Sequence, residues 1–517
     1  RRGSAARGRA LLSLVAVVAA VAPASEPGAV VDGTAYIVET IPLDTSTELV
    51  EGGRHTWEVL LQFIREAREK IDFTAMYWRL LHRKEKKNAS WAYDRGAEVH
   101  AALRSAAGRG VKLRALCGAG LDDHSEDHRE IEDLQGEYPD FISFQIYDPR
   151  TWYGGGIQHM KFWIFDDTRG MITSANMDWK SLSQVKELGV AFEGPPNFLA
   201  VKDLQLYFDR WWAWTASDVL MKTFSEGSCD SDIPGVCPYR MHFDQYMQVE
   251  RRVPCFSLAG KHTGADGPTC DNPMASVGQT AYNLANPMPL VLNGTRGATV
   301  LTCSPPSVCD TPLAAYSHFA PAPPGRTWDG DALVQTILGA RTHVNLSVMN
   351  FIPADFDCAW WPALNDALLA KVARGVQVRL LLSKWKHTST FIPDYLHSLQ
   401  ISAQAVASKA QLSNPGGSLE IRFFEVPGWQ GATGKDEDPY VDYSRVNHGK
   451  YIVTDRRFNI GTSNMEWGYF YKTAGLSFNS DHPLLRAQLT AAFERDWGSE
   501  YAVPWATRLV GDWLFSV

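Results

Sequence analysis

The sequence predicts an α/β fold made of two pseudo-repeated α/β units that form one bilobal molecule, with mixed β-sheets flanked by helices. Two observations predict it. Apolar residues switch between a period of two and a helical period along the chain, and five segments recur in the same order in both halves. With 517 residues, of which 45% are apolar, the chain is long enough to bury a large shared core.

Each copy of the repeat is expected to contain a strand, an amphipathic helix with an Arg-Gly turn and a strand, a further strand, a hairpin and a closing helix. In the first half these segments are 66–78, 101–117, 141–149, 158–179 and 204–214. In the second half they are 339–351, 367–383, 419–427, 447–467 and 489–499. Composition alone does not account for five matches in one order.

The repeat divides the chain into four parts. Residues 1–33 are expected to be a signal peptide or signal anchor with a linker. Residues 34–224 and 326–517 are the two halves, and residues 225–325 are an insertion and linker rich in cysteine and proline.

The N-terminal segment is typical of entry into the secretory pathway. Four arginines precede the apolar run 10–22, and small residues follow it. A cleaved signal peptide is the first interpretation, and a type II signal anchor is left open. The expected location is the secretory lumen, in a lysosome or endosome, or outside the cell.

Cysteines and sequons suit that compartment. No C-x-x-C pair occurs, which favours disulfides over a zinc site, although eight cysteines leave the connectivity open. The cysteines are Cys117, Cys229, Cys237, Cys255, Cys270, Cys303, Cys309 and Cys358. Candidate glycosylation sites are Asn88, Asn293 and Asn345, of which Asn345 lies in an apolar, strand-like run.

The motif with the clearest chemical meaning is His-x-Lys-x4-Asp, which occurs at the same place in both halves. Its residues are His159, Lys161 and Asp166 in the first half and His448, Lys450 and Asp455 in the second. Ser174 and Asn176 follow the first copy, and Ser463 and Asn464 follow the second. Because side chains two apart on a strand share a face, each half is expected to present an imidazole and an ammonium at a sheet edge.

This arrangement suits the cleavage of a phosphodiester. Lysine and amide groups can stabilise the charge that develops on the nonbridging oxygens without a metal. One neutral histidine can attack phosphorus, and one protonated histidine can donate to the leaving oxygen. The two halves must then face each other, with their histidines in different protonation states. Each motif aspartate either orients a distant histidine or is structural.

The paired motifs resemble the signature of the phospholipase D superfamily. The segments 174–189, 446–451 and 461–475 are similar to its lysosomal branch, types three and four, and the resemblance extends over about residues 34–505. It implies a pseudo-twofold α/β sandwich and a metal-independent phosphodiesterase with a covalent phosphohistidine. For that branch it implies a 5′-to-3′ exonuclease on single-stranded DNA or RNA, with phospholipase D or transphosphatidylase activity as the alternative.

The resemblance also implies residue roles. His159 would be the nucleophile and His448 the general acid, with the reverse left open. The residues implied to bind phosphate are Lys161, Lys450, Asn176 and Asn464, and the supporting residues are Ser174, Ser463 and Glu187. Thr473 is expected at the place equivalent to Glu187, so a carboxylate in one half only would give the histidines unlike pKa values.

Further signals are weaker. Trp152 and Tyr153, in a loop before His159, are candidates for a substrate contact, whereas Trp179 and Trp467 are expected in the core. The basic run 83–87 is a solvated loop or a phosphate track, and 124–128 (HSEDH) is not expected to bind metal.

The expected partners are single-stranded nucleic acid or phospholipid, with no metal and no cofactor. An N-terminal membrane anchor and a homodimer are left open. The net charge of −8 excludes a global basic signature, so any surface that binds phosphate must be local.

Overall fold

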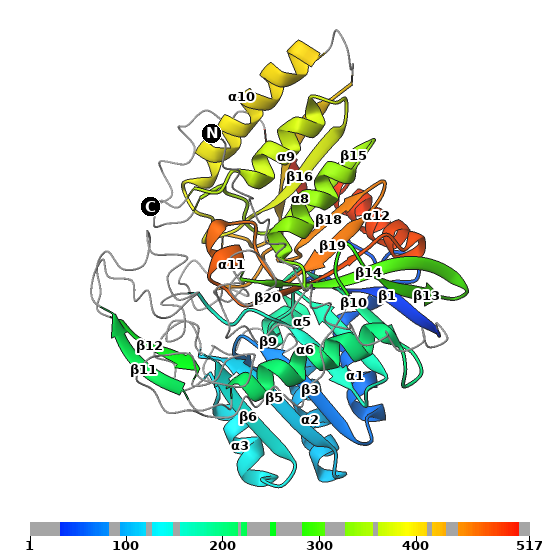
Figure 1. Cartoon of the computed structure of the whole chain (residues 1–517), viewed down its shortest axis with the longest axis vertical. Coiled ribbons are helices and arrows are strands. Elements are labelled where there is room, and N and C mark those ends of the chain that lie inside the picture. Colours follow the sequence, from blue (N-terminus) through cyan, green and yellow to red (C-terminus); the bar gives the residue numbers. More distant parts are fainter. Residues whose placement is uncertain are drawn as a thin grey trace, which may run out of the picture. The chain divides into compact units, whose positions relative to one another are not determined.

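Two sheets of the same design, one from each half of the chain, make up the fold (Figure 1). The structure is a computed structural model. It describes residues 31–81, 94–119, 127–147, 156–215, 219–224, 249–254, 282–305, 326–354, 360–410, 416–430 and 443–505.

In the N-terminal half the strands run in the order β6-β5-β3-β7-β8-β10-β1, with β2 beside β1. The three strands β3, β5 and β6 are parallel, and the pairings from β3 through β7, β8 and β10 to β1 are antiparallel. The strands are β1 (Asp32–Thr40), β2 (Arg54–His55), β3 (Lys70–Ala75), β5 (Lys112–Gly118), β6 (Ile142–Tyr147), β7 (Phe162–Phe165), β8 (Arg169–Thr173) and β10 (Glu187–Glu193).

The C-terminal half repeats this order as β17-β16-β15-β18-β19-β20-β14, with β21 added beyond β17 and β13 beyond β14. A short parallel pairing of β1 with β13 joins the two sheets. The strands are β13 (Met288–Leu292), β14 (Thr295–Ser304), β15 (His343–Val348), β16 (Gln377–Lys384), β17 (Ser418–Glu425), β18 (Tyr451–Thr454), β19 (Phe458–Gly461), β20 (Gly475–Ser480) and β21 (Ala502–Pro504).

The helices also follow one order in both halves. The first half contains α1 (Thr56–Glu66), α2 (Asp94–Gly108), α3 (Arg129–Glu137), α5 (Trp179–Ser183) and α6 (Leu199–Thr215). The second half contains α8 (Asp329–Gly339), α9 (Ala363–Val372), α10 (Ile392–Ala410), α11 (Trp467–Tyr471) and α12 (Pro483–Trp497). Short strands pair as β4 (Trp78–Arg79) with β9 (Met177–Asp178) and as β11 (Val219–Phe224) with β12 (Val249–Pro254). The predicted repeat of α/β units is therefore confirmed.

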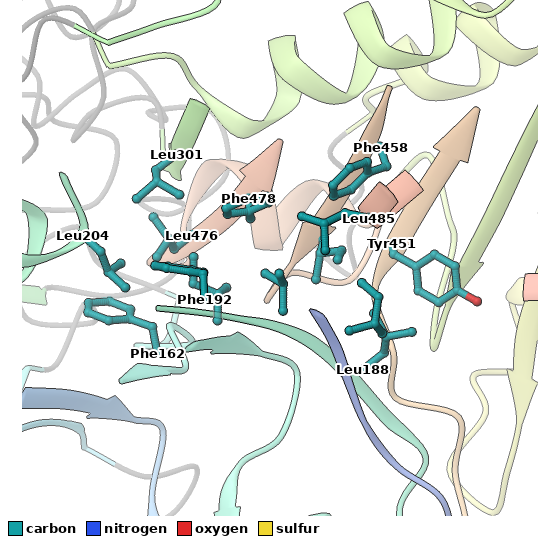
Figure 2. Close-up of a cluster of buried hydrophobic side chains, with 14 of the residues drawn as sticks. Phe162, Leu188, Phe192, Leu204, Leu301, Tyr451, Phe458, Leu476, Phe478 and Leu485 are labelled. Atoms are coloured by element: carbon teal, nitrogen blue, oxygen red, sulfur yellow. The ribbon is translucent and has the colours of Figure 1, made fainter. Parts of the chain in front are cut away.

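Three apolar cores hold these layers together. One packs α1, α2 and α3 on the N-terminal sheet, and a second packs α8, α9 and α10 on the C-terminal sheet. The largest lies between the halves and includes α6, α12 and strands of both sheets. In Figure 2, Phe192 of β10 and Phe478 of β20 come together in this shared core, with ring centroids 5.7 Å apart. Residues 31–517 accordingly form one compact unit, and β7 and β18 are buried at every position.

The structure extends the C-terminal half toward the N-terminus. Strands β13 and β14 fall inside the range 225–325 that the sequence analysis assigns to an insertion, yet β14 pairs with β20 over six residues. In the repeat, β14 takes the place that β1 takes in the first half. We therefore propose that the C-terminal half begins near residue 288 and that the insertion is shorter. The other proposed boundaries stay predictions.

The predicted glycosylation sites differ in accessibility. Asn345 lies in β15 and is fully buried, and its Oδ1 accepts a hydrogen bond from Arg379 Nε at 3.0 Å, so its prediction as an acceptor site is wrong. Asn293 is exposed at the turn between β13 and β14, with a φ of 48°. Asn88 and the segment 1–30 lie outside the described residues.

Two cysteines lie in described parts of the chain. Cys303 in β14 is disulfide-bonded, and Cys117 is free and buried, which raises the pKa of its thiol to about 12. The other six cysteines fall outside those parts. Within the described residues, no helix combines the length and the apolar character that crossing a membrane requires.

Candidate active site

Both His-x-Lys segments lie immediately before an interior strand of a sheet. Lys161 precedes β7, which pairs with β3 and β8, and Lys450 precedes β18, which pairs with β15 and β19. The motifs therefore lie where interior strands of the two sheets begin, and not along an outer strand. Each lysine also folds back, since Lys161 Nζ donates to the carbonyl of His159 at 3.0 Å and Lys450 Nζ to that of His448 at 2.7 Å.

Each motif is held by the opposite half of the chain. The backbone N–H of His159 donates to Ala474 O at 2.9 Å, and that of His448 donates to Lys186 O at 2.7 Å. The exchange brings the two imidazole rings together at the boundary between the halves, with centroids 6.4 Å apart and planes at 79°. The rings are only 3% and 8% exposed. A phosphorus atom between them could be approached from opposite sides.

One of the two histidines has a carboxylate partner. His448 Nδ1 lies 2.9 and 3.0 Å from the two carboxylate oxygens of Glu187, which is fully buried, so the Nδ1–H donates to them. Ser174 Oγ donates to the same carboxylate at 2.6 Å. Burial would raise the pKa of Glu187, but His448 and Lys450 outweigh burial and lower it. Glu187 is therefore ionised and stabilises a protonated His448.

The counterpart of Glu187 in the repeat is Gly475, and the expected Thr473 is wrong. Ser174 Oγ accepts from the N–H of Leu188, and the N–H of Ser174 donates to the carbonyl of Leu188. Thr462 bonds Leu476 in the same way through its Oγ1 and its N–H. Thr462 thus matches Ser174, and the residue before Leu476 matches Glu187. By the same register, Ser463 corresponds to Ala175 and not to Ser174.

Gly475 carries no carboxylate, and any side chain at this position would require two neighbouring serines to move. A Cβ at this position would come within 2.5 Å of both Ser304 Oγ and Ser463 Oγ. His159 Nδ1 is buried and has no hydrogen-bond partner among the described residues. Of the two equivalent positions in the repeat, one therefore carries a carboxylate beside its histidine and the other does not.

The two histidines consequently differ in protonation. Burial, followed by the charges of Lys161, Lys450 and His448, lowers the pKa of His159 well below its usual value. Burial also lowers the pKa of His448, but Glu187 opposes that shift. His159 is thus the more strongly held in its neutral form.

The two motif lysines form a buried pair of cationic groups. Each is 1% exposed. Burial and the neighbouring Lys450 lower the pKa of Lys161 well below its usual value, and burial lowers that of Lys450 to about 7, although Glu187 and Glu466 oppose the latter. A bound phosphate would raise the pKa of both lysines again, because a nearby anion favours their charged form.

Two asparagines follow the motifs and retain unused polar groups. Asn464 is 1% exposed, and both its Oδ1 and its Nδ2 lack a partner in the described parts of the chain. Asn176 donates weakly to the hydroxyl of Tyr77 at 3.4 Å, and its Oδ1 is unbonded there. Buried polar groups are nearly always paired in native proteins, so these amides are available to a polar ligand.

The motif aspartates bond backbone N–H groups and not the histidines, which favours the structural one of the two roles that the sequence leaves open. Asp166 accepts hydrogen bonds from three consecutive backbone N–H groups, those of residues 68–70, at 2.8 to 3.0 Å. Asp455 accepts from the N–H groups of Arg341 and Thr342. Five extended residues of about 3.3 Å each place the Cα atoms of these aspartates roughly 16 Å from those of the motif lysines. They fix the start of β3 and β15.

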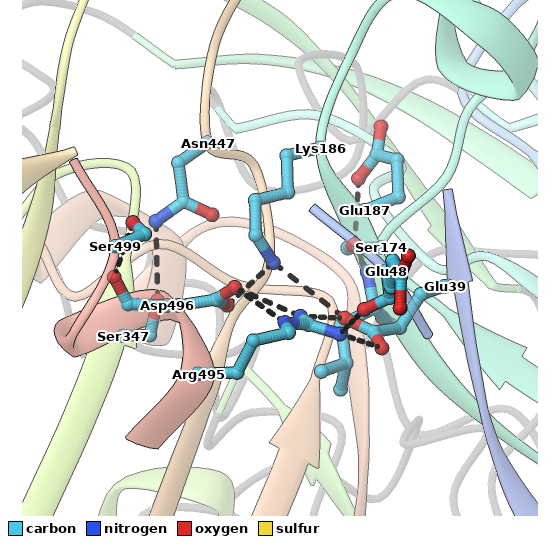
Figure 3. Close-up of polar contacts among 11 residues, drawn as sticks. Glu39, Glu48, Ser174, Lys186, Glu187, Ser347, Asn447, Arg495, Asp496 and Ser499 are labelled. Atoms are coloured by element: carbon cyan, nitrogen blue, oxygen red, sulfur yellow. Dashed lines mark hydrogen bonds and ion pairs between the residues drawn. The ribbon is translucent and has the colours of Figure 1, made fainter. Parts of the chain in front are cut away.

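A cluster of charged side chains lies next to Glu187 (Figure 3). Lys186, its neighbour in the chain, points into the cluster, with its Nζ 2.7 Å from Asp496 and 3.6 Å from Glu39. Arg495 contacts the same two carboxylates, at 2.6 Å from Glu39 and 2.8 Å from Asp496. The cluster ties the start of β10 to β1 and α12, which fixes the backbone that carries Glu187 and that accepts from His448. The counterpart of Lys186 is Ala474, so this support is also confined to one half.

Comparisons with known proteins agree with this geometry. Residues 60–212 match the family model "Cardiolipin synthase, PLD-like domain", and residues 290–429 match "PLD3/4, PLD-like domain". The chain is 30% identical over 476 residues to 5'-3' exonuclease PLD3 of Rattus norvegicus, covering 90% of this chain and 80% of the relative. The chain belongs to the phospholipase D family.

Other members include the human 5'-3' exonuclease PLD3, 30% identical over 477 residues that cover 90% of this chain and 80% of the relative. Phospholipase D Z of Dictyostelium discoideum is 29% identical over 482 residues, 92% of each chain. As a phospholipase D family member, the protein is a phosphodiesterase hydrolase, and the predicted enzyme class is confirmed.

Sequence reasoning missed Lys186, Thr462 and Gly475 as parts of this phospholipase D site. The first is adjacent to Glu187, but nothing in the sequence places Glu39 and Asp496 beside it. Tyr469, one of many aromatic residues near the motifs, contacts His159 edge-on with ring centroids 5.0 Å apart. Trp179 and Trp467 are buried, as predicted.

Several weaker predictions are only partly within the described residues. Trp152, Tyr153 and the basic run 83–87 lie outside them. Of the segment 124–128, Asp127 pairs with Arg79, and His128 Nε2 lies 2.7 Å from the carbonyl of Gly118. The described residues contain no group of three His, Cys, Asp or Glu side chains that could hold a metal ion.

Proposed function

We propose that the protein is a metal-independent 5′-to-3′ exonuclease that hydrolyses single-stranded DNA or RNA through a covalent phosphohistidine. His159 is the nucleophile and His448 the general acid. The observation that carries these roles is that Glu187 contacts His448, whereas its counterpart near His159 is Gly475.

In the first step neutral His159 attacks phosphorus. An N–P bond forms as the P–O bond to the leaving group breaks, and the leaving oxygen takes its proton from His448. Lys161, Lys450 and the amides of Asn176 and Asn464 stabilise the charge on the nonbridging oxygens. Glu187 holds the tautomer and orientation of His448 throughout.

In the second step the phosphohistidine is hydrolysed. His448, now neutral, accepts a proton from water, whose oxygen attacks phosphorus as the N–P bond breaks. The products are a phosphate monoester and neutral His159, and His448 is again protonated. The cycle therefore needs no cofactor.

The mechanism is tested by trapping the intermediate. Both His159→Ala and His448→Ala are expected to abolish turnover of an oligonucleotide. With a labelled 4-nitrophenyl phosphodiester, whose leaving group needs little protonation, His448→Ala should still accumulate acid-labile phosphoenzyme, whereas His159→Ala should not. Labelling of the His159→Ala variant would reverse the assignment.

The nucleic-acid substrate is supported by the relatives that are named 5'-3' exonuclease. The test uses a 3′-labelled single-stranded oligonucleotide with a 5′-hydroxyl, at pH 5 in EDTA, with the duplex as control. Stepwise loss of nucleotides from the 5′ end is expected. Absence of shortening, while phosphatidyl transfer proceeds in parallel, would contradict the proposal.

The second candidate function is phospholipase D or transphosphatidylase activity with the same histidines. Relatives named phospholipase D Z and phospholipase D Y support it. Lysophospholipid and a primary alcohol are the substrates for its assay.

We also propose a lumenal location, in a lysosome or endosome. The disulfide at Cys303 and the exposed Asn293 of the β13–β14 turn support it. A glycosidase-sensitive shift in electrophoretic mobility should disappear in Asn293→Gln if this residue carries a glycan.

A further inference from the structure

A stack of aromatic rings with lysines beside it lies close to the second motif. The ring of Tyr443 is parallel to that of His387, with planes 8° and centroids 4.3 Å apart. Trp385 meets both rings edge-on, at 4.9 Å from His387 and 6.2 Å from Tyr443. Tyr443 is 59% exposed, and His387 is exposed as well. We call Trp385, His387 and Tyr443 the aromatic platform.

The platform is connected to the active site through the backbone and a hydrogen bond. Trp385 directly follows β16, and Ser383 near the end of that strand accepts a hydrogen bond from the backbone N–H of Asn447, the residue before His448. Tyr443 precedes His448 by five residues, so their Cα atoms are at most about 17 Å apart. The platform is thus within the reach of a few nucleotides from a strand held at the histidines.

The backbone that presents Tyr443 is specifically held. Tyr443 and Arg445 have φ of 55° and 53°, in the left-handed region that non-glycine residues seldom adopt. Arg445 is fully buried, and its guanidinium donates to the carbonyls of Pro427 and Leu43 at 2.6 and 2.8 Å. Strained backbone of this kind persists where the surroundings enforce it and concentrates at functional sites.

Two lysines lie beside the platform in the sequence. Lys386 is exposed, and Lys384 lies with its Nζ 3.5 Å from Glu425 and 4.6 Å from the ring centre of Trp429. Flat rings combined with lysines bind single-stranded nucleic acid without sequence preference, because every base has a face that can stack. A lipid surface would call for contiguous apolar area, which a stack of imidazole, phenol and indole provides less well.

From this geometry we propose that the aromatic platform, with Lys384 and Lys386, is a subsite that stacks the bases of single-stranded nucleic acid next to the scissile phosphodiester. The inference rests on the proposed exonuclease function and adds its substrate subsite. It also explains how a site made for a bare phosphodiester gains selectivity for a nucleic acid strand, since the histidines and lysines contact only the phosphate.

The test compares two substrates at pH 5 and fixed salt. In Trp385→Ala and Tyr443→Ala, the ratio of kcat/KM on a single-stranded oligonucleotide to that on bis(4-nitrophenyl) phosphate should fall about 5- to 150-fold, the range for the loss of one stacking residue. Trp385→Phe and Tyr443→Phe should restore the ratio. Lys386→Gln should lower the salt dependence of oligonucleotide binding by about one phosphate contact. Leu338→Ala, an exposed residue at the end of α8, is the control.

Each other outcome contradicts the inference. An unchanged ratio in both alanine variants overturns the platform alone, provided that the wild-type protein shortens the oligonucleotide. An equal loss on both substrates shows a structural role, which thermal melting would confirm. A loss on lysophospholipid vesicles with oligonucleotide hydrolysis retained makes the surface a lipid-docking one. If the wild-type protein does not hydrolyse the oligonucleotide, the exonuclease function and the platform fail together.

Discussion

The substitution Glu187→Gln tests the origin of the difference between the two histidines. It keeps the size of the side chain and one acceptor for His448 Nδ1 but removes the charge. Glu187 is fully buried and lies 2.9 to 3.0 Å from the imidazole nitrogen. At a separation of about 4 Å between charge centres and an effective dielectric constant near 20, the Coulomb attraction amounts to about 4 kcal/mol. Its loss reduces the population of protonated His448 roughly 10³-fold at a given pH.

The pH dependence gives the sign of the effect. The proposed mechanism needs protonated His448 for turnover, so the rate should fall as pH rises through the pKa of that histidine. Burial already lowers this pKa and Glu187 opposes the shift, so removing the carboxylate lowers it further. The descending limb of kcat in Glu187→Gln should therefore lie at a more acidic pH than in the wild-type protein.

The assay measures kcat from pH 3.5 to 7.5 on two substrates. An oligonucleotide has an alkoxide leaving group that needs a proton, and we expect a loss of about 10²- to 10⁴-fold near pH 6, the usual contribution of a general acid. A 4-nitrophenyl ester leaves without a proton and should lose much less. A rate within twofold of wild type, or an equal loss on both substrates, would refute the reasoning.

Three further substitutions probe the site. Because burial lowers the pKa of Lys450 to about 7, KM for an anionic substrate should increase as pH rises past neutral in the wild-type protein. It should increase less in Lys450→Arg, in which only Lys161 of the motif lysines can still lose its proton, and a flat wild-type profile from pH 5.5 to 8.5 would contradict this. Asp166→Ala removes the acceptor of three backbone N–H groups and should lower the free energy of unfolding by about 2–4 kcal/mol with kcat/KM unchanged, whereas a catalytic aspartate would lose activity. Lys186→Met leaves buried carboxylates unpaired and should cost about 3–5 kcal/mol in urea unfolding, compared with no change for the exposed Lys202→Met; equal stability of the two variants would argue against the charged cluster.

The sequence predicted the features that depend on local periodicity. The hairpins that follow the motifs are short apolar runs joined by a turn, and they fold as β7–β8 and β18–β19. Strand β14 was not predicted, because its place in the sheet depends on pairing with β20, which lies about 175 residues later in the chain. Helices α3 and α10 also escaped the repeat, since they occupy equivalent places with little likeness in sequence.

The site was predicted as far as residue type and spacing allow. Pairing Lys186 with Lys472 by identity leads to Thr473 as the counterpart of Glu187. Lys472, however, caps the end of α11, and the register is set by the hydroxyl of Thr462 on Leu476. A tertiary hydrogen bond therefore shows that Glu187 corresponds to Gly475, whereas residue identity alone places the counterpart two positions earlier.

Because the fold is duplicated, the difference between the two histidines has to come from residues that differ between the two halves. Two identical half-sites would give two histidines with equal pKa values, and neither would be committed to attack or to proton donation. The structure departs from that symmetry at two adjacent positions, where Glu187 and Lys186 of one half face Gly475 and Ala474 of the other. The carboxylate sets the charge of His448, and the lysine anchors the strand that carries it. These two positions therefore give the two histidines different surroundings, which suits the two copies of one unit to the different chemical steps that we propose.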